Sequence, residues 1–287
     1  MPGRRLRFAI RLSQPVLGVA VRSGWLIEGE AGWAEWSPLP SWSLEEAATA
    51  LRGAIDAARE PFPSPRPGPV EVNAMVPRVP PRVAARMAAG SGCATVKVKV
   101  GDPEGEARVR AVRAAVGPVV RLRVDGNGAW GVEEAELALA RLSAYSIEMA
   151  EDPVRTLSEM ALLRRRTSVP LAAEMAVRTP DDARELRRLD AADLLVVKPQ
   201  RIGGIAAALR AAELAGRPVI VSSALETSVG LATCLAVAAA LPDPGHAHGI
   251  GTALLLTEDV TSDPLLPVAG RLTPRRVVPD RLLGTVP

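Results

Sequence analysis

The sequence is poor in cysteine, histidine, lysine and aromatic side chains. Its 287 residues include two cysteines and two histidines, only three of its 35 Lys+Arg residues are lysines, and aromatic residues make up 3%. The two cysteines, Cys93 and Cys234, exclude a disulfide-stapled scaffold, and we expect buried thiols in a reducing compartment. At this length the chain can bury the core of a large α/β domain.

Long hydrophobic runs are absent as well. No segment approaches the roughly 18 apolar residues that are typical of a membrane helix. The basic N-terminus also lacks the apolar stretch of a secretory signal. We therefore expect a cytoplasmic protein that does not insert into membranes.

No stretch is dominated by charge of one sign. The formal net charge is +3 and the isoelectric point is near 9.3, but the arginines alternate with Asp and Glu, apart from one triplet at 164–166. With few aromatic side chains to stack on bases, this pattern argues against a nucleic-acid partner. A small molecule is the expected partner.

The first 69 residues differ in composition from the rest. Apolar runs over 6–12, 17–23 and 24–30, separated by turn-forming residues, predict antiparallel strands. The segment 43–60 has the apolar spacing of a helix with Ser43 as its N-cap. Four of the five tryptophans lie in this part, and the proline-rich stretch 61–69 is typical of a connector, so we expect a separate module.

From residue 70 onward, short apolar runs alternate with amphipathic segments. This alternation predicts βα units around a parallel sheet, and eight strand runs in one series favour a closed barrel over 70–264. Because the C-terminal ends of parallel strands meet at one mouth of a barrel, side chains at those ends should converge there. The strands end, at intervals of 23–26 residues, at Asn73, Lys99, Asp125, Glu151, Glu174, Lys198, Ser222 and His248.

Three consecutive strand ends carry carboxylates. Asp125, Glu151 and Glu174 would lie side by side, where they would repel one another without a cation. Carboxylate oxygens are the ligands that hard divalent cations prefer, so the set predicts Mg²⁺, with Mn²⁺ as a substitute. An ordinary solvated or helix-capping role is the alternative for each carboxylate taken alone.

The three lysines lie on two strands of this barrel. Lys97 and Lys99 are two residues apart and share a face, and Lys198 ends a strand on the opposite side. A buried lysine can lose its proton near neutral pH, but an arginine cannot. Lys99 and Lys198 therefore suit removal of a proton next to a carboxylate, with a metal holding the enediolate. The alternative is that these lysines are surface charges at strand ends. That role would be unusual for lysine in a chain that otherwise uses arginine for surface charge.

The order of these residues resembles a known superfamily. The chain is similar to the enolase superfamily, in particular its muconate-lactonizing-enzyme-like subgroup, in five motifs: Lys97-Val98-Lys99, Asp125-Gly126-Asn127, Glu151-Asp152-Pro153, Glu174 and Lys198-Pro199. Within the subgroup, NAMVPRVPP, SSALETSVGLA and HGIGTALLLTEDV resemble the o-succinylbenzoate synthase family of actinobacterial type. The similarity covers about residues 32–266.

The resemblance implies a fold and a reaction. The fold is an α/β modified TIM barrel of (β/α)7β type with a small α+β capping domain, residues 1–69, on which residues 265–287 pack. The reaction is the Mg²⁺-dependent syn dehydration of 2-succinyl-6-hydroxy-2,4-cyclohexadiene-1-carboxylate to o-succinylbenzoate, a hydro-lyase step of menaquinone biosynthesis. Sites of this superfamily use a Lys or His base together with Mg²⁺.

The resemblance also implies roles for the strand-end residues. Lys99 would remove the proton α to the carboxylate and then help hydroxide leave, and Lys198 would stabilise the enediolate from the opposite face. The three carboxylates named above would bind Mg²⁺, with Lys97 and Asn127 as supporting contacts.

Two serines add a candidate substrate contact. Ser222 and Ser223 could hold carboxylate or carbonyl oxygens of the substrate. The alternative, equally open from the sequence, is that they cap the helix that begins near Glu226.

The sequence departs from the family pattern in three places. Where the family has Asp-Glu-Ser, this chain has Glu174-Met175-Ala176, which puts the geometry of the metal ligands in doubt. The N-terminal module is short for a capping domain, and its loop at 14–18 should cover the mouth. His246 and His248 could suggest a metal pair, but without a matching partner we expect a structural role.

Two other functions are compatible with the same residues. An N-acylamino-acid racemase or dipeptide epimerase would use the same two opposed lysines to remove and return a proton. A barrel retained only for binding would explain the altered segment at 174–176. The sequence does not specify an oligomeric state, and a monomer is consistent with it.

Overall fold

The N-terminal part of the chain is a meander of three antiparallel strands followed by a helix. The computed structural model describes residues 3–281, and here strands β1 (Arg5–Val16), β2 (Val19–Gly29) and β3 (Gly32–Trp36) precede helix α1 (Leu44–Arg59). Ser43 caps α1 as predicted: its side chain accepts the Glu46 backbone N–H, and the Glu46 side chain accepts that of Ser43. We call residues 3–59 the cap.

One predicted turn in the cap is wrong. The sequence predicts a break between strands over 17–23 and 24–30, but β2 continues through Ser23 and Gly24, and Gly24 pairs with Phe8 of β1. A Cβ at Gly24 would lie 2.4 Å from the Trp36 carbonyl oxygen. The glycine therefore serves the close approach of another backbone segment, a role that the sequence alone does not distinguish from a turn.

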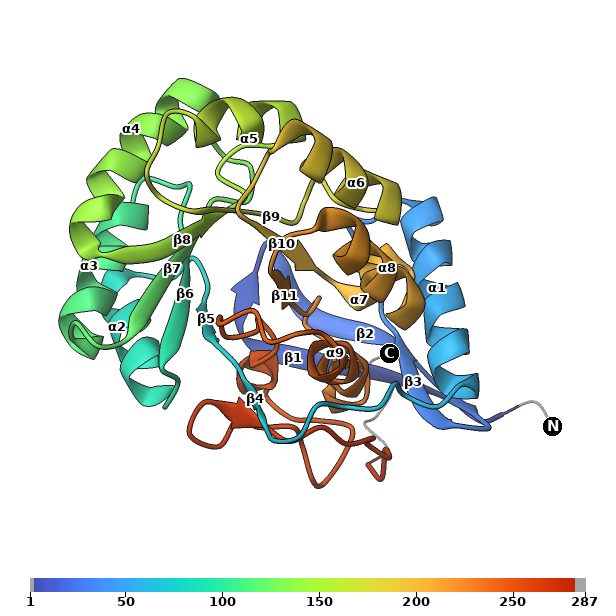
Figure 1. Cartoon of the computed structure of the whole chain (residues 1–287). Coiled ribbons are helices and arrows are strands. Elements are labelled where there is room, and N and C mark those ends of the chain that lie inside the picture. Colours follow the sequence, from blue (N-terminus) through green and yellow to red (C-terminus); the bar gives the residue numbers. More distant parts are fainter. Residues whose placement is uncertain (1–2, 282–287) are drawn as a thin grey trace.

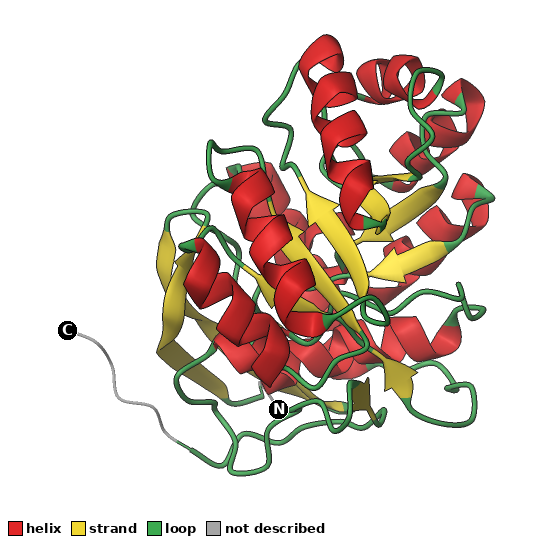
Figure 2. Cartoon of the chain, turned by 90° about the vertical axis from the view of Figure 1, so that its left-hand side faces the viewer, coloured by secondary structure: helices red, strands yellow, loops and turns green. Residues whose placement is uncertain are grey.

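The rest of the chain alternates parallel strands with helices, as predicted. The sheet has the order β11-β10-β9-β8-β7-β6-β5. In Figure 1 the helices α2 to α6 form an arc outside these strands, and Figure 2 shows helices on the outer side of the curved sheet. The strands of this sheet are β5 (Ala74–Val76), β6 (Thr95–Lys99), β7 (Arg121–Asp125), β8 (Ile147–Glu151), β9 (Leu171–Ala173), β10 (Leu194–Val197) and β11 (Val219–Val221). Two further strands, β4 (Val70–Glu71) and β12 (Arg271–Leu272), pair antiparallel with each other in a separate sheet.

The helices follow the strands with short connections. They are α2 (Pro81–Gly90), α3 (Gly105–Val116), α4 (Val132–Leu142), α5 (Leu157–Arg164), α6 (Pro180–Leu189), α7 (Pro199–Ile202), α8 (Ile205–Ala215) and α9 (Ser228–Ala240), with 3₁₀ turns η1 (Ser143–Tyr145) and η2 (Thr252–Leu255). No helix within residues 3–281 has both the length and the apolar character needed to cross a bilayer.

The barrel closes through a very short eighth strand. The backbone N–H of His248 donates to Glu71 O at 2.8 Å, and that of Gly249 donates to Val221 O at 2.7 Å, which joins the two edges of the sheet. The first strand does not end at Asn73 as predicted, because β5 continues to Val76 beyond it.

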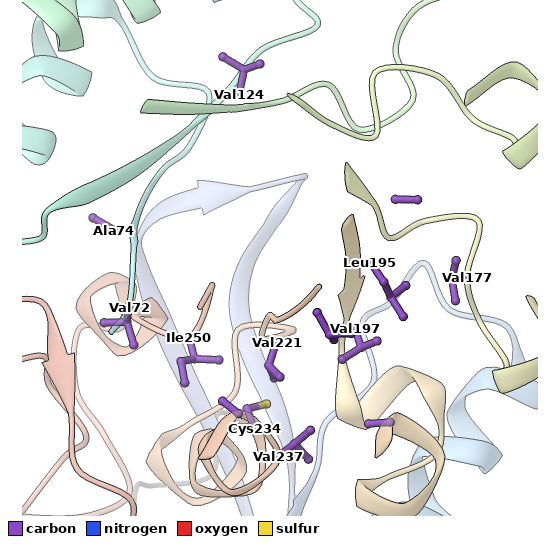
Figure 3. Close-up of a cluster of buried hydrophobic side chains, with 14 of the residues drawn as sticks. Val72, Ala74, Val124, Val177, Leu195, Val197, Val221, Cys234, Val237 and Ile250 are labelled. Carbon is purple, nitrogen blue, oxygen red and sulfur yellow. The ribbon is translucent and has the colours of Figure 1, made fainter. Parts of the chain in front are cut away.

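Side chains alternate between the outside of the barrel and its interior. Val96 and Val98 belong to the main hydrophobic core with the helices, whereas Lys97 and Lys99 take the intervening positions. Figure 3 shows part of this outer core, where Val221 of β11 lies near Cys234 of α9. A second apolar cluster, formed by Met149, Ala172, Leu194, Val196 and Ile220, takes the alternate positions of β8 to β11. Because this cluster is apolar, the polar side chains of the barrel interior are those at the C-terminal strand ends.

The cap contacts the barrel and the C-terminal segment. The Thr257 N–H donates to Arg11 O at 3.0 Å, and the Arg276 guanidinium donates to Ala57 O at 3.2 Å. The division into a capping domain 1–69, a barrel 70–264 and a C-terminal segment 265–287 stays a prediction, and residues 282–287 lie outside the described range.

A buried polar network lies between cap and barrel. Arg22 of β2, only 1% exposed, donates from Nε to Leu225 O at 3.1 Å and from its guanidinium to Ser37 Oγ at 2.8 Å. Gln200 of α7 accepts the Ser37 N–H at 2.7 Å and donates to Glu226 at 3.0 Å. Leu225 has φ +67°, a backbone conformation that costs about 1–3 kcal/mol in a residue with a Cβ and persists only where the surroundings enforce it.

Glu35 of β3 completes this network. Its carboxylate accepts hydrogen bonds from Ser37 Oγ at 2.6 Å, the Thr227 N–H at 3.0 Å and the Gly230 N–H at 3.1 Å. Burial, together with the Glu226 charge, raises the pKa of Glu35 to about 7, against the opposing effects of these hydrogen bonds and of Arg22.

We expect Glu35 to make stability depend on pH. From pH 5 up to about 7 the folded state keeps a proton on Glu35 that the unfolded chain has released, so the free energy of unfolding falls as the pH rises and levels off by pH 8. A raised pKa of this size corresponds to a loss of roughly 2 kcal/mol over that range. Urea unfolding at the two pH values should show this loss in the wild type and a smaller one in Glu35→Gln.

The control for this experiment is Glu30→Gln, at an exposed position just after β2, which should keep the wild-type dependence on pH. An identical pH dependence in wild type and Glu35→Gln would show that Glu35 does not carry the effect.

Candidate active site

Strand register brings the predicted residues together at the C-terminal mouth of the barrel. Lys99 pairs with Asp125 across β6 and β7, and Asp125 pairs with Glu151 across β7 and β8. Glu174 and Lys198 directly follow β9 and β10. Each side chain is placed by the same rule: it stands at an inward position where its strand ends.

The lysines of β6 neutralise the first two carboxylates. Lys97 Nζ lies 2.8 and 2.9 Å from the two Glu151 oxygens and 3.1 Å from Asp125 Oδ2, and Lys99 Nζ lies 2.6 Å from Asp125 Oδ2. All four side chains are at most 8% exposed. Charges at this depth are tolerated because each has a partner of opposite sign.

The third carboxylate is held from the other side of the mouth. Lys198 Nζ lies 2.6 Å from Glu174 Oε2, and the Arg201 guanidinium lies 3.2 Å from Glu174 Oε1. Arg201 also contacts Glu46 of the cap helix at 3.1 Å. The cap is thereby connected to the mouth through charged groups.

The two opposed lysines have pKa values shifted in opposite directions. Burial, reinforced by the charges of Lys97 and Lys198, lowers the pKa of Lys99 even though Asp125 opposes the shift. Burial acts on Lys198 too, but Glu174 and Glu151 outweigh it and raise its pKa. Lys99 therefore gives up its proton more readily than Lys198 and is the more available of the two in the neutral form that a base needs, whereas Lys198 is the more firmly held cation.

Sequence reasoning missed one carboxylate of this cluster, Asp152. It follows Glu151 with φ +42°, and its side chain accepts the backbone N–H groups of Glu174 at 2.8 Å and Met175 at 3.1 Å. Burial and the neighbouring Glu174 and Glu151 charges raise its pKa well above the usual range. The Asp152-Pro153 pair directly after β8 was the only sequence signal for this carboxylate. The alternation of side chains ends with the strand at Glu151, so it does not predict the direction of the Asp152 side chain.

The donor set fits a hard divalent cation. Within residues 3–281, Glu151, Asp152 and Glu174 each offer an oxygen within 4.8 Å of the others, and the set contains no sulfur or imidazole. Asp125 lies beside Glu151, where Lys97 Nζ contacts both. The buried Oδ1 of Asn127 has no partner among the described residues, and the Asn127 N–H donates to Asp125 Oδ1 at 3.1 Å. Oxygen donors therefore surround this corner of the mouth.

Ser222 and Ser223 line the same pocket as the three lysines. Ser222 Oγ lies 3.3 Å from Gly249 O, and Ser223 Oγ lies 2.6 Å from Thr252 Oγ1. The alternative that these serines cap the next helix is wrong, because Thr227 caps α9 by accepting the Val229 N–H.

Apolar side chains cover the pocket. Val16, the last residue of β1, and Leu17 of the following turn both lie within the predicted covering loop, and Leu39 and Leu225 line the pocket with them. The cavity has a volume of about 50 Å³ and is lined by both these apolar side chains and the lysines of the mouth.

The two histidines do not form a metal pair. His246 Nδ1 lies 2.8 Å from Glu148 Oε1, and His248 Nδ1 accepts the Val221 N–H at 2.9 Å. Burial and the nearby Arg123 and Arg66 charges lower the pKa of His248 to about 4, so its neutral ring serves as a structural acceptor.

Fold and site together define a class of protein. A small cap on a barrel of parallel strands, with carboxylates and lysines at consecutive strand ends, is the arrangement of the enolase superfamily. Residues 81–281 match the model of enolase C-terminal domain-like proteins, and residues 8–58 match that of enolase N-terminal domain-like proteins.

Relatives that match over most of the chain identify the family within this superfamily. The chain is 48% identical over 282 residues to an o-succinylbenzoate synthase of Thermobifida fusca, covering 96% of this chain and 88% of the relative. It is 44% identical over 281 residues to that of Mycobacterium marinum, covering 94% and 85%. The chain belongs to the o-succinylbenzoate synthase family.

Solved structures share the fold at low identity. A dipeptide epimerase from Enterococcus faecalis, complexed with Mg and the dipeptide L-Leu-L-Tyr, is 22% identical with a TM-score of 0.82, covering 96% of this chain and 97% of that one. An N-succinyl Arg/Lys racemase from Bacillus cereus is also 22% identical, with a TM-score of 0.74 and coverage of 89% and 88%. At this identity the likeness concerns the fold alone.

Proposed function

We propose that this chain catalyses the syn dehydration of 2-succinyl-6-hydroxy-2,4-cyclohexadiene-1-carboxylate to o-succinylbenzoate, a lyase step of menaquinone biosynthesis. The observation that supports this function most strongly is the position of Lys99 and Lys198, which line one pocket from opposite strands of the barrel. Membership of the o-succinylbenzoate synthase family supports the choice of substrate. The proposed domain division and a cytoplasmic location follow from the same assignment.

Asp125, Glu151 and Glu174 would hold Mg²⁺. Asp152 is a weaker candidate, because its oxygens already accept the N–H groups of Glu174 and Met175. Asp152 would instead position Glu174 through these hydrogen bonds. This support would compensate for the departure from the family pattern at 174–176. When bound, the cation would supply Lewis-acid stabilisation of negative charge on the substrate carboxylate.

The two lysines would handle the proton and the charge. Lys99 Nζ, in its neutral form, removes the proton on the ring carbon α to the carboxylate. The same group then returns a proton to the departing hydroxyl on the adjacent carbon, so that water leaves on the same face and the ring becomes aromatic. Lys198 Nζ, held as a cation, faces the negative charge that develops on the carboxylate.

The remaining polar groups would orient the substrate. Lys97 fixes Glu151 and Asp125, the Asn127 N–H fixes Asp125, and Ser222 and Ser223 line the pocket in which the substrate oxygens would lie. We assign these residues as supporting rather than reacting groups.

The direct test is the formation of o-succinylbenzoate from its cyclohexadiene precursor. We expect turnover that depends on added Mg²⁺, is lost on chelation and returns when Mg²⁺ is restored. The absence of product under saturating substrate and Mg²⁺ would overturn the proposed function.

A racemase or epimerase is the second candidate, because lysines on opposite sides of one pocket can also remove and return a proton. Incubation with N-succinyl amino acids in D₂O separates the two. Fast α-deuteration without any synthesis of o-succinylbenzoate would favour this candidate.

A further inference from the structure

The loop from Ser222 to Thr227, between β11 and α9, is held in place from the cap. Arg22 reaches it from β2, where Nε donates to Leu225 O at 3.1 Å. The same guanidinium donates to the backbone and side-chain oxygens of Ser37. Because Arg22 is only 1% exposed, water cannot readily replace these partners if the side chain is removed.

This loop needs such support. Leu225 has φ +67°, outside the range that residues with a Cβ usually adopt. The four residues 222–225 line the pocket that also contains Lys99 and Lys198. A change in the Leu225 backbone therefore changes the wall of the pocket.

Two glutamates fix the other end of the loop. Glu226 accepts the Ala224 N–H at 2.6 Å, and Glu35 of the cap accepts the Thr227 N–H at 3.0 Å. Both carboxylates are buried, and Arg22 is the cation whose charge acts on both. Arg22 thus provides both a hydrogen bond to the loop and the charge that balances its glutamates.

We propose that Arg22 is a positioning residue: it fixes the backbone of the loop so that Ser222 and Ser223 face the substrate. It acts through Leu225 and Ser37 rather than by touching the reacting atoms. The proposal rests on the proposed function, because its kinetic effect is measured as formation of o-succinylbenzoate.

The test compares two substitutions at one position. In Arg22→Met the hydrogen bonds and the charge are both lost, whereas Arg22→Lys keeps the charge but cannot span Leu225 and Ser37 together. Contacts made equally in the ground state and the transition state change KM and leave kcat alone, so we expect KM to rise about tenfold in Arg22→Met, with kcat within about threefold of wild type. The KM of Arg22→Lys should lie between those of wild type and Arg22→Met.

Hydrogen exchange gives a second readout that does not need substrate. We expect the amides of 222–230 to exchange at least about tenfold faster in both variants, while those of β6 to β8 keep their wild-type protection. The matched control is Leu26→Ala, a buried position on the same strand outside the network, which should lower stability without changing KM or the exchange of the loop.

The outcomes separate the possible failures. If the wild type forms no product, the proposed function fails, and exchange alone decides whether Arg22 orders the loop. If both folded variants keep wild-type KM and loop exchange, the proposal is wrong. An equal rise in KM for Leu26→Ala would also overturn it, since general loosening of the cap would then explain the effect. If Arg22→Met does not fold, Arg22→Lys decides.

Discussion

Replacing Lys99 by arginine should lower kcat at least about 10³-fold while the protein stays folded, because one residue would serve as both base and acid. Arginine keeps the positive charge that faces Asp125 Oδ2, now 2.6 Å from Lys99 Nζ. It cannot give up a proton near neutral pH, so the α-proton would stay on the substrate. Turnover and α-deuterium exchange measured together would show whether proton removal is the step that is lost.

Two further variants control for the size and the charge of arginine. Lys99→Ala removes both and should be equally inactive, which excludes steric exclusion of substrate as the cause. Lys97→Arg makes the same change two residues earlier, where the side chain pairs with Glu151 and Asp125, and should keep more activity. If wild type, Lys99→Ala and Lys99→Arg all showed the same background level of activity, the barrel would not use Lys99, and a binding-only role would regain support.

The strand-end residues were predictable because local alternation determines them. An inward side chain at the end of a parallel strand faces the mouth whatever the rest of the chain does, and the spacing of 23–26 residues locates those ends. Lys99, Asp125 and Glu151 are accordingly found in register. The capping box of Ser43 and Glu46 is a local signal of the same kind.

The groups that the sequence did not predict depend on long-range contacts or on unusual backbone. Asp152 enters the cluster through its positive φ, which no alternation pattern encodes. Arg22 meets Leu225, some 200 residues away in the chain, only after the cap has docked. Their side chains resemble ordinary surface charges in the sequence, and only burial in the folded protein sets them apart.

Replacing Glu151 by glutamine should weaken Mg²⁺ binding by at least about tenfold and lower kcat at saturating Mg²⁺ at least about 10²-fold. The carboxylate offers two charged oxygens, both now held by Lys97 Nζ at 2.8 and 2.9 Å, whereas an amide offers one neutral oxygen. The loss of charge also leaves Lys97 to pair with Asp125 alone, which competes with a cation for that ligand. Isothermal titration with Mg²⁺ measures the first effect, and the product assay measures the second.

The matched control lies on the same strand. Glu148 stands three residues earlier on β8 and contacts Arg123 and His246 rather than the lysines of the mouth. Glu148→Gln therefore makes the same chemical change at the opposite end of the barrel and should leave Mg²⁺ affinity unaltered. Equal affinities in wild type, Glu151→Gln and Glu148→Gln would remove Glu151 from the metal site. The same loss in both variants would mean that titration reports the stability of β8 instead. A loss confined to Glu151→Gln would locate the cation at the C-terminal end of β8, beside Lys97.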